Sequence, residues 1–444
     1  LINIISYACN ACPTKQVRVT NMCQGCLAHP CMEVCPKDAI SLVQGKSVID
    51  QAKCIKCGKC FNQCPYRAIS KIERPCAAAC GMDAIESDEL GRAKINYDKC
   101  VSCGMCLVNC PFAAIADKSQ IFQVIQAVKR GEEVIACVAP AFVGQYGKAA
   151  TPAKLKAAMR TLGFTDVVEV AIGADLCTVE EAHDFLEEVP EKLDWMGTSC
   201  CPAWSMMAKK LFPQFKDNIS MALTPMVITA RMVKKDHPNA RIVFVGPCSA
   251  KKLEANRRSV RSDVDFVLTF EELRAILDAR GLELAEMPEI TAGEPSSYGR
   301  IFARTGGVAE SVRRVAKLEG IETEINPIRC SGIEECIKTM KLASFGRLEE
   351  NLIEGMACKG GCTNGAASIF HDQKGIQRVN DFSRLALTDN PMEGIRGYDM
   401  AGVNMEREFP ELEKMKEITA GEKKAKKQAT AKAKKEAIAK GEVE

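Results

Sequence analysis

From about residue 134 onward, apolar residues alternate between two kinds of pattern. Short apolar runs, such as VIACV from 134, DVVEVAI from 166 and IVFVG from 242, are typical of buried β-strands. Between them, stretches such as AKLKAAMRTLG from 153 and EELRAILDARG from 271 place apolar residues at helical spacing. Strands that alternate with helices predict an α/β fold with parallel sheets.

The first part of the chain has a different pattern, rich in turns and short of long helical repeats. It holds 16 of the 25 cysteines, all within residues 1–110. A region held together by metal needs less apolar core than an ordinary domain. We therefore expect an α+β domain over 1–120 and an α/β domain, built as two lobes, over 121–418. The Lys- and Ala-rich stretch 419–444 is expected to be a frayed helix or a disordered tail without a specific partner.

Charge and composition narrow the class of protein. Lys and Arg number 60 against 57 Asp and Glu, which gives no general case for a nucleic-acid or membrane partner. No apolar run is long enough to span a bilayer, and the start lacks the form of a signal peptide. With the tight Cys-x2-Cys groups, this favours iron–sulfur clusters in a reducing, cytoplasmic compartment over disulfides. Only four histidines are present, which argues against zinc or haem as the main chemistry.

The cysteine-rich region contains an internal repeat. CMEVCPKDAI from 31 recurs as CAAACGMDAI from 76, and CIKCGKCFNQCP from 54 recurs as CVSCGMCLVNCP from 100. The spacing C-x2-C-x2-C-x3-C-P is that of bacterial ferredoxins, where three cysteines bind one 4Fe–4S cubane and the fourth reaches the neighbouring cubane. The repeat therefore predicts two ferredoxin-like units in tandem, and it disfavours the alternatives of zinc or structural thiols.

The same crossing rule predicts how the cysteines are shared among the clusters. The expected sets are Cys23, Cys26, Cys31 and Cys64 for one cubane, Cys54, Cys57, Cys60 and Cys35 for a second, and Cys100, Cys103, Cys106 and Cys80 for a third.

The second unit lacks a Cys-x2-Cys pair of its own. This leaves Cys76 and Cys110 without partners, while Cys9 and Cys12 have the required spacing and no other use. We expect these four thiols to hold a fourth accessory cubane. The alternative is that Cys9 and Cys12 are free thiols of a frayed terminus, which would leave Cys76 and Cys110 without partners.

Three further motifs lie in the α/β part. They read TSCCPAW from 198, GPCSAKKLE from 246 and EGMACKGGCTNG from 354. Each alone has a bland interpretation, as buried small cysteines, surface lysines or a zinc loop. However, Cys248 closes a predicted strand, and ligands collect at the carboxyl ends of strands in such sheets. Cys201, Cys248, Cys358 and Cys362 would together make a fourfold thiolate set for a fifth cubane.

In this order the three motifs closely resemble the signature motifs of iron–iron hydrogenases. The resemblance runs from about 134 to 400 and includes APA from 139, GADL from 173, EEA from 180 and TGGV from 305. It implies reversible conversion of protons and electrons into hydrogen. Gly246, Ala203 and Glu188 depart from the common pattern, as does TNGAA after Cys362, and these departures resemble the B subgroup of the family.

The resemblance also implies a role for individual residues. The four thiolates would hold the cubane of an H-cluster, and Cys362 would bridge it to a two-iron centre carrying CO, cyanide and an aza-dithiolate. Lys251 would hydrogen-bond a cyanide. The other residues lining the cofactor would be Pro140, Ala141, Met356 and Phe302. Cys200 would exchange protons with the bridging amine, and the path to solvent would continue through Glu181, Ser220 and Asp184.

Partners and rival functions follow from the same comparison. The chain has no dinucleotide fingerprint and no flavin signature, so we expect a small ferredoxin as electron carrier, and maturation proteins that supply the two-iron centre. A hydrogen sensor is one alternative, but such relatives often lack the cysteine at Cys200. A non-catalytic iron–sulfur assembly protein is another, but it would need neither Cys200 nor Lys251. The leftover cysteines, Cys137, Cys177, Cys330 and Cys336, are expected to be buried small residues.

Overall fold

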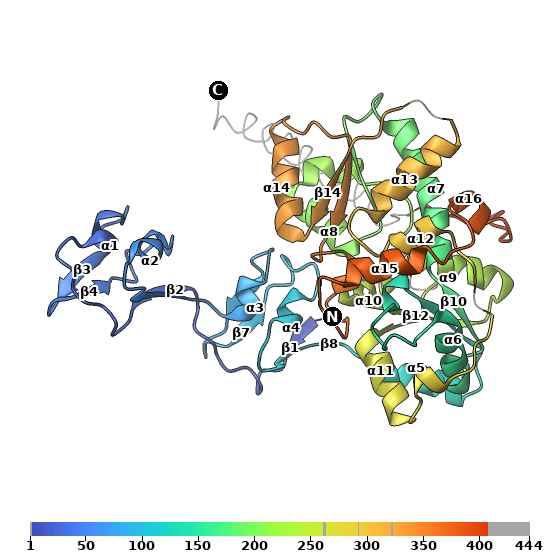
Figure 1. Cartoon of the computed structure of the whole chain (residues 1–444), viewed down its shortest axis with the longest axis horizontal. Helices are drawn as coiled ribbons and strands as arrows, with labels where there is room; N and C mark the ends of the chain where they lie inside the picture. The colour runs from blue at the N-terminus through green and yellow to red at the C-terminus, as the bar shows by residue number, and fades with distance from the viewer. Residues whose placement is uncertain (1, 261–262, 292, 321–322, 407–444) are drawn as a thin grey trace, which may run out of the picture.

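The structure is a computed structural model that describes residues 2–260, 263–291, 293–320 and 323–406. The predicted tail over 419–444 lies outside the described residues. Figure 1 shows two α/β lobes and, extending from them, a chain of two small cysteine-rich units. Within the described residues no helix is both long and apolar enough to cross a membrane.

The first small unit consists of short elements around its cysteines. Its elements are β2 (Gln16–Val19), α1 (Pro30–Glu33), β3 (Ile40–Val43), β4 (Lys46–Ile49), α2 (Lys59–Gln63) and β5 (Ile69–Ile72). Strand β2 pairs antiparallel with β5, and β3 pairs antiparallel with β4. The apolar core is small, as expected where clusters supply much of the cohesion.

The second unit has the same layout, but its first strand comes from the N-terminus. Its elements are β1 (Ile2–Ile4), α3 (Pro75–Ala78), β6 (Ile85–Ser87), β7 (Ala93–Ile95), α4 (Met105–Val108) and β8 (Ile115–Asp117). Strand β1 pairs antiparallel with β8, and Ile2 lies opposite Asp117. The first unit is therefore an insertion within the second, and the N-terminal segment is part of the second unit.

The first lobe contains a four-stranded parallel sheet in the order β10-β9-β12-β13. Its strands are β9 (Val134–Val138), β10 (Asp166–Glu169), β12 (Arg241–Gly246) and β13 (Phe266–Thr269). The helices connected to them are α5 (Ile121–Lys129), α6 (Pro152–Thr161), α7 (Ala171–Glu188), α9 (Pro225–Asp236) and α11 (Phe270–Ala279). This confirms the predicted α/β class.

The second lobe contains a three-stranded parallel sheet in the order β11-β15-β14. Its strands are β11 (Met196–Gly197), β14 (Pro327–Ser331) and β15 (Leu352–Met356), and helices α8 (Pro202–Leu211) and α14 (Ile333–Ser344) pack against them around Trp204. The other helical segments are η1 (Pro140–Phe142), η2 (Pro213–Asn218), α10 (Ser249–Ala255), η3 (Leu284–Glu286), α12 (Ser297–Ile301), α13 (Gly307–Leu318), η4 (Cys362–Asn364), α15 (Gly375–Ser383) and α16 (Pro391–Gly394).

One strand prediction is wrong in its extent. The apolar run from 166 is a strand only to Glu169, and from Ala171 the chain forms the 18-residue helix α7. Helix α7 is buried on several sides, so its first turn is apolar all round and has no helical periodicity to read. This helix carries Glu181 and Asp184 of the predicted proton path.

Candidate functional site

A cavity of about 650 Å³ lies where the carboxyl ends of the two sheets meet. Strand β12 leads into it through Pro247 and Cys248, and β15 through Met356. Its full lining is Ala139, Pro140, Ala141, Val170, Ala174, Cys200, Cys201, Pro202, Pro225, Met226, Phe244, Pro247, Cys248, Lys251, Phe302, Ala303, Met356 and Cys362. Parallel sheets present their carboxyl ends to a shared crevice, which is why motifs far apart in sequence converge here.

Three of the four predicted ligand thiols line this cavity, namely Cys201, Cys248 and Cys362. Cys358 lies just outside the lining, but the charges of the other three thiols act on it. Burial raises the pKa of Cys248 to about 11 and that of Cys362 to about 12, with neighbouring thiols contributing. Thiols with such pKa values keep their protons at neutral pH unless a metal displaces them, so a cluster would have to drive their deprotonation.

Lys251 is the cation of the cavity. Its Nζ donates to Glu254 Oε2 at 2.7 Å and to the carbonyl oxygen of Cys200 at 3.3 Å. Glu254 is itself held by the hydroxyl of Thr224, 3.2 Å away. These hydrogen bonds hold the Lys251 ammonium group, which comes from the first turn of α10, in the cavity wall beside the thiols. There it could pair with an anionic ligand.

Cys200 lines the cavity next to Cys201. Burial raises the pKa of the Cys200 thiol well above its ordinary value, and the charge of Glu181 raises it further. Glu181 is fully buried on α7, and its Oε1 accepts from the backbone N–H of Ser199 at 2.5 Å. The thiol and the carboxylate are thus close enough to influence one another.

The outer residues of the predicted proton path form a separate contact. The Ser220 hydroxyl donates to Asp184 Oδ2 at 2.7 Å. Burial raises the pKa of Asp184, and the hydrogen bond from Ser220 opposes that shift. Glu181, Asp184 and Glu188 are spaced by three and four residues on α7, so they lie along one face of the helix. Glu188 ends this row in an ion pair with Lys192 at 3.2 Å.

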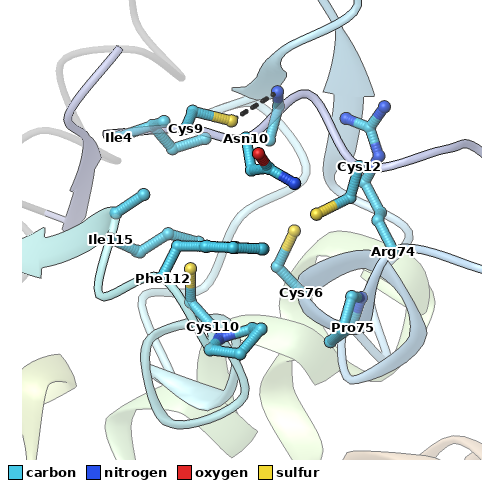
Figure 2. Close-up of a pocket in the computed structure, with 13 residues that line it drawn as sticks. Ile4, Cys9, Asn10, Cys12, Arg74, Pro75, Cys76, Cys110, Phe112 and Ile115 are labelled. Atoms are coloured by element: carbon cyan, nitrogen blue, oxygen red, sulfur yellow. Dashed lines mark hydrogen bonds between the residues drawn. The ribbon is translucent and has the colours of Figure 1, made fainter. Parts of the chain in front are cut away.

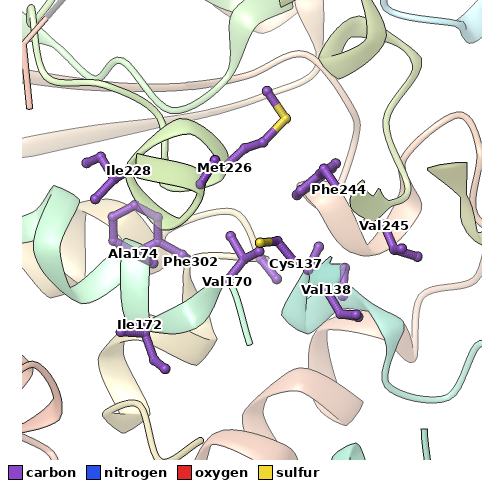
Figure 3. Close-up of a cluster of buried hydrophobic side chains, with 14 of the residues drawn as sticks. Cys137, Val138, Val170, Ile172, Ala174, Met226, Ile228, Phe244, Val245 and Phe302 are labelled. Carbon is purple, nitrogen blue, oxygen red and sulfur yellow. The ribbon is translucent and has the colours of Figure 1, made fainter. Parts of the chain in front are cut away.

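Several lining residues were not anticipated from the sequence. Val170, Ala174, Met226 and Phe244 belong both to the cavity wall and to the apolar core behind it, together with the predicted Phe302 (Figure 3). Val170 lies between β10 and α7, and the other three come from α7, α9 and β12. All four carry only the ordinary signal of buried apolar residues.

The ring of Phe244, one of these wall residues, limits the size of the residue at position 246. A Cβ at this position would lie 2.5 Å from the ring of Phe244. A larger residue at 246 would therefore require the Phe244 ring to move, since real Cβ contacts are not that short. The ring takes part of the space that a side chain at 246 would need, which gives a physical reason for glycine there.

The four leftover cysteines are buried, which confirms that prediction. Cys137 and Cys177 lie in the core of the first lobe, and Cys330 and Cys336 lie in the core of the second. Cys330 donates to the Thr339 hydroxyl at 3.2 Å.

Two predicted ligand sets in the small units each surround one cavity. Cys9, Cys12, Cys76 and Cys110 line a cavity of about 360 Å³, with their sulfur atoms directed towards it (Figure 2). The set Cys23, Cys26, Cys31 and Cys64 lines one of about 330 Å³. In the described residues no group of three His, Cys, Asp or Glu side chains is arranged around a single metal ion. Thiols around a cubane stand further apart, because four irons and four sulfides lie between them.

In the remaining two sets, those of Cys106 and Cys60, neighbouring cysteines affect the pKa values of one another's thiols. Burial raises the pKa of Cys106 to about 12, and the charges of Cys103, Cys100 and Cys80 raise it further. Burial also raises the pKa of Cys60, with smaller effects from Cys54 and Cys57. Cys35 accepts from the backbone N–H of Ala39 at 3.3 Å.

The third set lies beside the cavity between the two lobes. The charge of Cys201 acts on Cys103, and the charge of Cys103 acts on Cys358. Lys210 fastens the two parts together, because its Nζ donates to the carbonyl oxygens of Tyr97, Asp98 and Cys100 at 3.2, 2.7 and 2.9 Å. The third thiol set of the second unit therefore lies close to the predicted ligand thiols of the cavity.

A buried ion pair supports the wall that carries Phe302. Arg300 on α12 donates to both carboxylate oxygens of Glu169, at 3.0 and 3.2 Å, and both side chains are almost fully buried. Burial raises the pKa of Glu169, and the charge of Arg300 opposes this. Helix α12 is thereby tied to the end of β10.

We expect Arg300→Leu to lower the free energy of unfolding by about 3–5 kcal/mol, because it leaves the Glu169 carboxylate buried without its partner. The double variant Glu169→Met/Arg300→Leu should lose less, because no charge stays buried. Urea denaturation followed by circular dichroism measures both. A double variant as unstable as the sum of its single variants would contradict this account.

Fold and cavity together define a protein of the iron-only hydrogenase class, built on an α/β scaffold with iron–sulfur units in front. Residues 132–366, over half of the chain, match the family described as "Iron only hydrogenase large subunit, C-terminal domain". The chain belongs to this family, which confirms the resemblance read from its motifs. Residues 23–74 and 70–121 each match the LdpA Fe-S cluster-binding domain, in agreement with two units in tandem.

Individual relatives agree with this assignment. The chain is 30% identical over 403 residues to iron hydrogenase 1 of Clostridium pasteurianum, covering 78% of this chain and 69% of that protein. It is 27% identical over 291 residues to cytosolic iron-sulfur assembly component 3 of Bos taurus, covering 53% of this chain and 61% of that protein. Among solved structures, the FeFe-hydrogenase HydA1 of Chlamydomonas reinhardtii has a TM-score of 0.52 at 23% identity, over 63% of this chain and 93% of that one. This last similarity supports the fold.

Proposed function

We propose that the chain catalyses reversible hydrogen production, in which two protons and two electrons from reduced ferredoxin give hydrogen and oxidised ferredoxin. One observation carries the proposal. A single apolar cavity brings together three predicted ligand thiols, the additional thiol of Cys200 and the ammonium group of Lys251. A purely structural cubane needs four thiolates, and Cys200 and Lys251 are additional to those.

The residues fit an H-cluster. The thiols of Cys201, Cys248, Cys358 and Cys362 would hold its cubane, and Cys362, which lines the cavity, would also bind the two-iron centre. When bound, the two-iron centre supplies the site at which protons and electrons combine. The cavity is otherwise walled by side chains such as Pro140, Met356 and Phe302, which would exclude water and oxygen from it.

The chain's own residues would move the protons. The buried Cys200 thiol holds its proton at neutral pH because its pKa is raised, so it can act as a donor at the cavity wall. Glu181 would then return a proton to the Cys200 thiol, and the hydrogen-bonded pair of Ser220 and Asp184 would continue the proton route towards solvent. Lys251 would orient the cofactor by a charge-assisted hydrogen bond to an anionic ligand.

A role in iron–sulfur assembly is the second candidate, because proteins with that name are among the relatives. Cys200 and Lys251 in the cavity wall favour the enzyme, since an assembly scaffold would not need them there. The two functions are distinguished by infrared spectroscopy of the matured protein. CO and cyanide bands together with hydrogen turnover support the enzyme, whereas cubanes without those bands after maturation support the assembly role.

We expect the isolated, matured chain to evolve hydrogen from reduced ferredoxin and to show no robust activity with NADH. The chain contains no Gly-x-Gly-x-x-Gly fingerprint, so the sequence gives no signal of a nicotinamide-binding site. Gas chromatography of hydrogen with each donor measures this. Robust NADH-dependent activity without further subunits would refute it.

A cytoplasmic location stays a prediction, because one relative is named as periplasmic.

A further inference from the structure

The two ferredoxin-like units present the same face to different surroundings. In the second unit this face surrounds Cys103 and packs against the lobes. Val101 is 1% exposed in the core around Trp204, and the carbonyl oxygen of Ser102 accepts from the Ser249 hydroxyl at 3.0 Å. A Cβ on Gly104 would lie 2.4 Å from the Cβ of Ala366. The second unit thus uses the face around Cys103 to bring its cluster next to the catalytic cavity.

In the first unit the equivalent face is bare. The repeat aligns Cys57 with Cys103, Ile55 with Val101 and Gly58 with Gly104. Ile55 is 55% exposed, and a Cβ on Gly58 would meet nothing within 4 Å. Among the 25 cysteines, all within the described residues, Cys57 is the exposed one. Figure 1 shows this unit at the end of the molecule away from the lobes.

The bare face differs from its counterpart in charge. Lys56, Lys59 and Lys37 stand where the second unit has Ser102, Met105 and Met82. Lys53 adds a fourth cation beside the first ligand of the motif, and Asp38 is the acidic side chain next to Lys37. Residues 16–72 hold eight Lys and Arg against three Asp and Glu, whereas the whole chain holds 60 against 57. Basic side chains therefore outnumber acidic ones in this unit by a wider margin than in the chain as a whole.

We propose that the face around Cys57, defined by Lys37, Lys53, Ile55, Lys56 and Lys59, docks a small acidic one-electron carrier protein. This rests on the proposed function, which requires electrons to enter the chain of clusters. The exposed ligand Cys57 brings its cluster to the surface, and Ile55 supplies an apolar contact at the centre. The lysines would steer a negatively charged partner and fix its orientation, as charged rims do at transient electron-transfer interfaces.

The test measures binding of an acidic ferredoxin to the chain carrying its iron–sulfur clusters, by calorimetry at increasing salt. Lys53→Glu/Lys59→Glu should weaken the affinity about tenfold or more at low salt and remove most of its salt dependence. The matched control is Arg18→Glu/Lys71→Glu. It makes the same charge change on the β2–β5 strand pair, whose ends line the cavity of the set that contains Cys23, and should weaken binding much less.

Turnover provides a second readout. Hydrogen evolution from ferredoxin by the Lys53→Glu/Lys59→Glu variant should show a KM raised about tenfold, with an unchanged rate from the small dye methyl viologen. Equal effects of the two double variants, or no effect of either, would overturn the docking face, since net charge alone or another surface would then govern binding. A matured chain that is inactive with methyl viologen would refute the proposed function instead, while the binding measurement would still decide the docking face.

Discussion

Replacing Cys200 by alanine is expected to reduce hydrogen turnover about 10²–10⁴-fold, the range attributed to a positioned proton donor. Cys200 lines the cavity next to the predicted ligand Cys201, and its raised pKa keeps the proton on the sulfur. Alanine has no exchangeable proton, so it would interrupt the proposed proton route from Glu181 to the cavity at that atom. The measurement is methyl viologen-dependent hydrogen evolution by protein matured to the same cofactor content as the wild type.

The control separates proton transfer from damage to the cofactor. Cys137→Ala removes a buried thiol from the neighbouring strand β9, outside the cavity lining, and should retain most of its activity. Infrared bands of CO and cyanide should be present in both variants, because neither residue belongs to the proposed ligand set. If Cys200→Ala with an intact cofactor turned over at the wild-type rate, Cys200 would not be the proton donor.

The parts of the site that could be predicted are those encoded locally. The proposed ligand cysteines occur at fixed short spacings, because one loop must wrap one cubane, and such spacings are visible in the sequence. Lys251 follows Cys248 by three residues within one motif. The alternation of strands and helices likewise predicted parallel sheets, since it depends on periodicity within each segment.

The parts that could not be predicted depend on packing between distant segments. Val170, Met226 and Phe244 reach the cavity from three elements, and each has the pattern of an ordinary core residue. The early start of α7 is hidden for a related reason, since its first turn is apolar on all sides and gives no amphipathic signal. Physical contact, and not local sequence, distinguishes such wall residues from the rest of the core.

The N-terminal segment was predictable only in part. The cysteine count suggested that Cys9 and Cys12 complete the fourth set, and the strand pairing explains how the segment is held in the second unit. Ile2–Ile4 pair with Ile115–Asp117, and the Tyr97 hydroxyl donates to the carbonyl oxygen of Ile2 at 3.0 Å. These contacts place Cys9 and Cys12 in the second unit, at the cavity shared with Cys76 and Cys110. The stretch between Cys12 and Cys76 forms the first unit, and bringing the ends of so long a stretch together costs little, because closure entropy grows slowly with length.

The double variant Cys9→Ser/Cys12→Ser is therefore expected to lose one cubane, about four irons per chain. The pair supplies half of the thiols around the cavity in Figure 2, and two thiolates alone hold a cubane weakly. Iron analysis and electron paramagnetic resonance of the reduced protein measure the loss. Hydrogen evolution from ferredoxin should fall as well, because the second unit lies between the first unit and the lobes (Figure 1).

A matched variant shows whether the effect is specific to these positions. Cys330→Ala/Cys336→Ala also removes two thiols, but both lie in the apolar core of the second lobe, so the iron content should stay at the wild-type value. Burial raises the pKa of Cys76, and the charge of Arg74, which is buried at the cavity of the fourth set, opposes that rise. Arg74 would face fewer thiolates in the N-terminal variant. An unchanged iron content in Cys9→Ser/Cys12→Ser, with all resonance signals intact, would show that other residues complete this site.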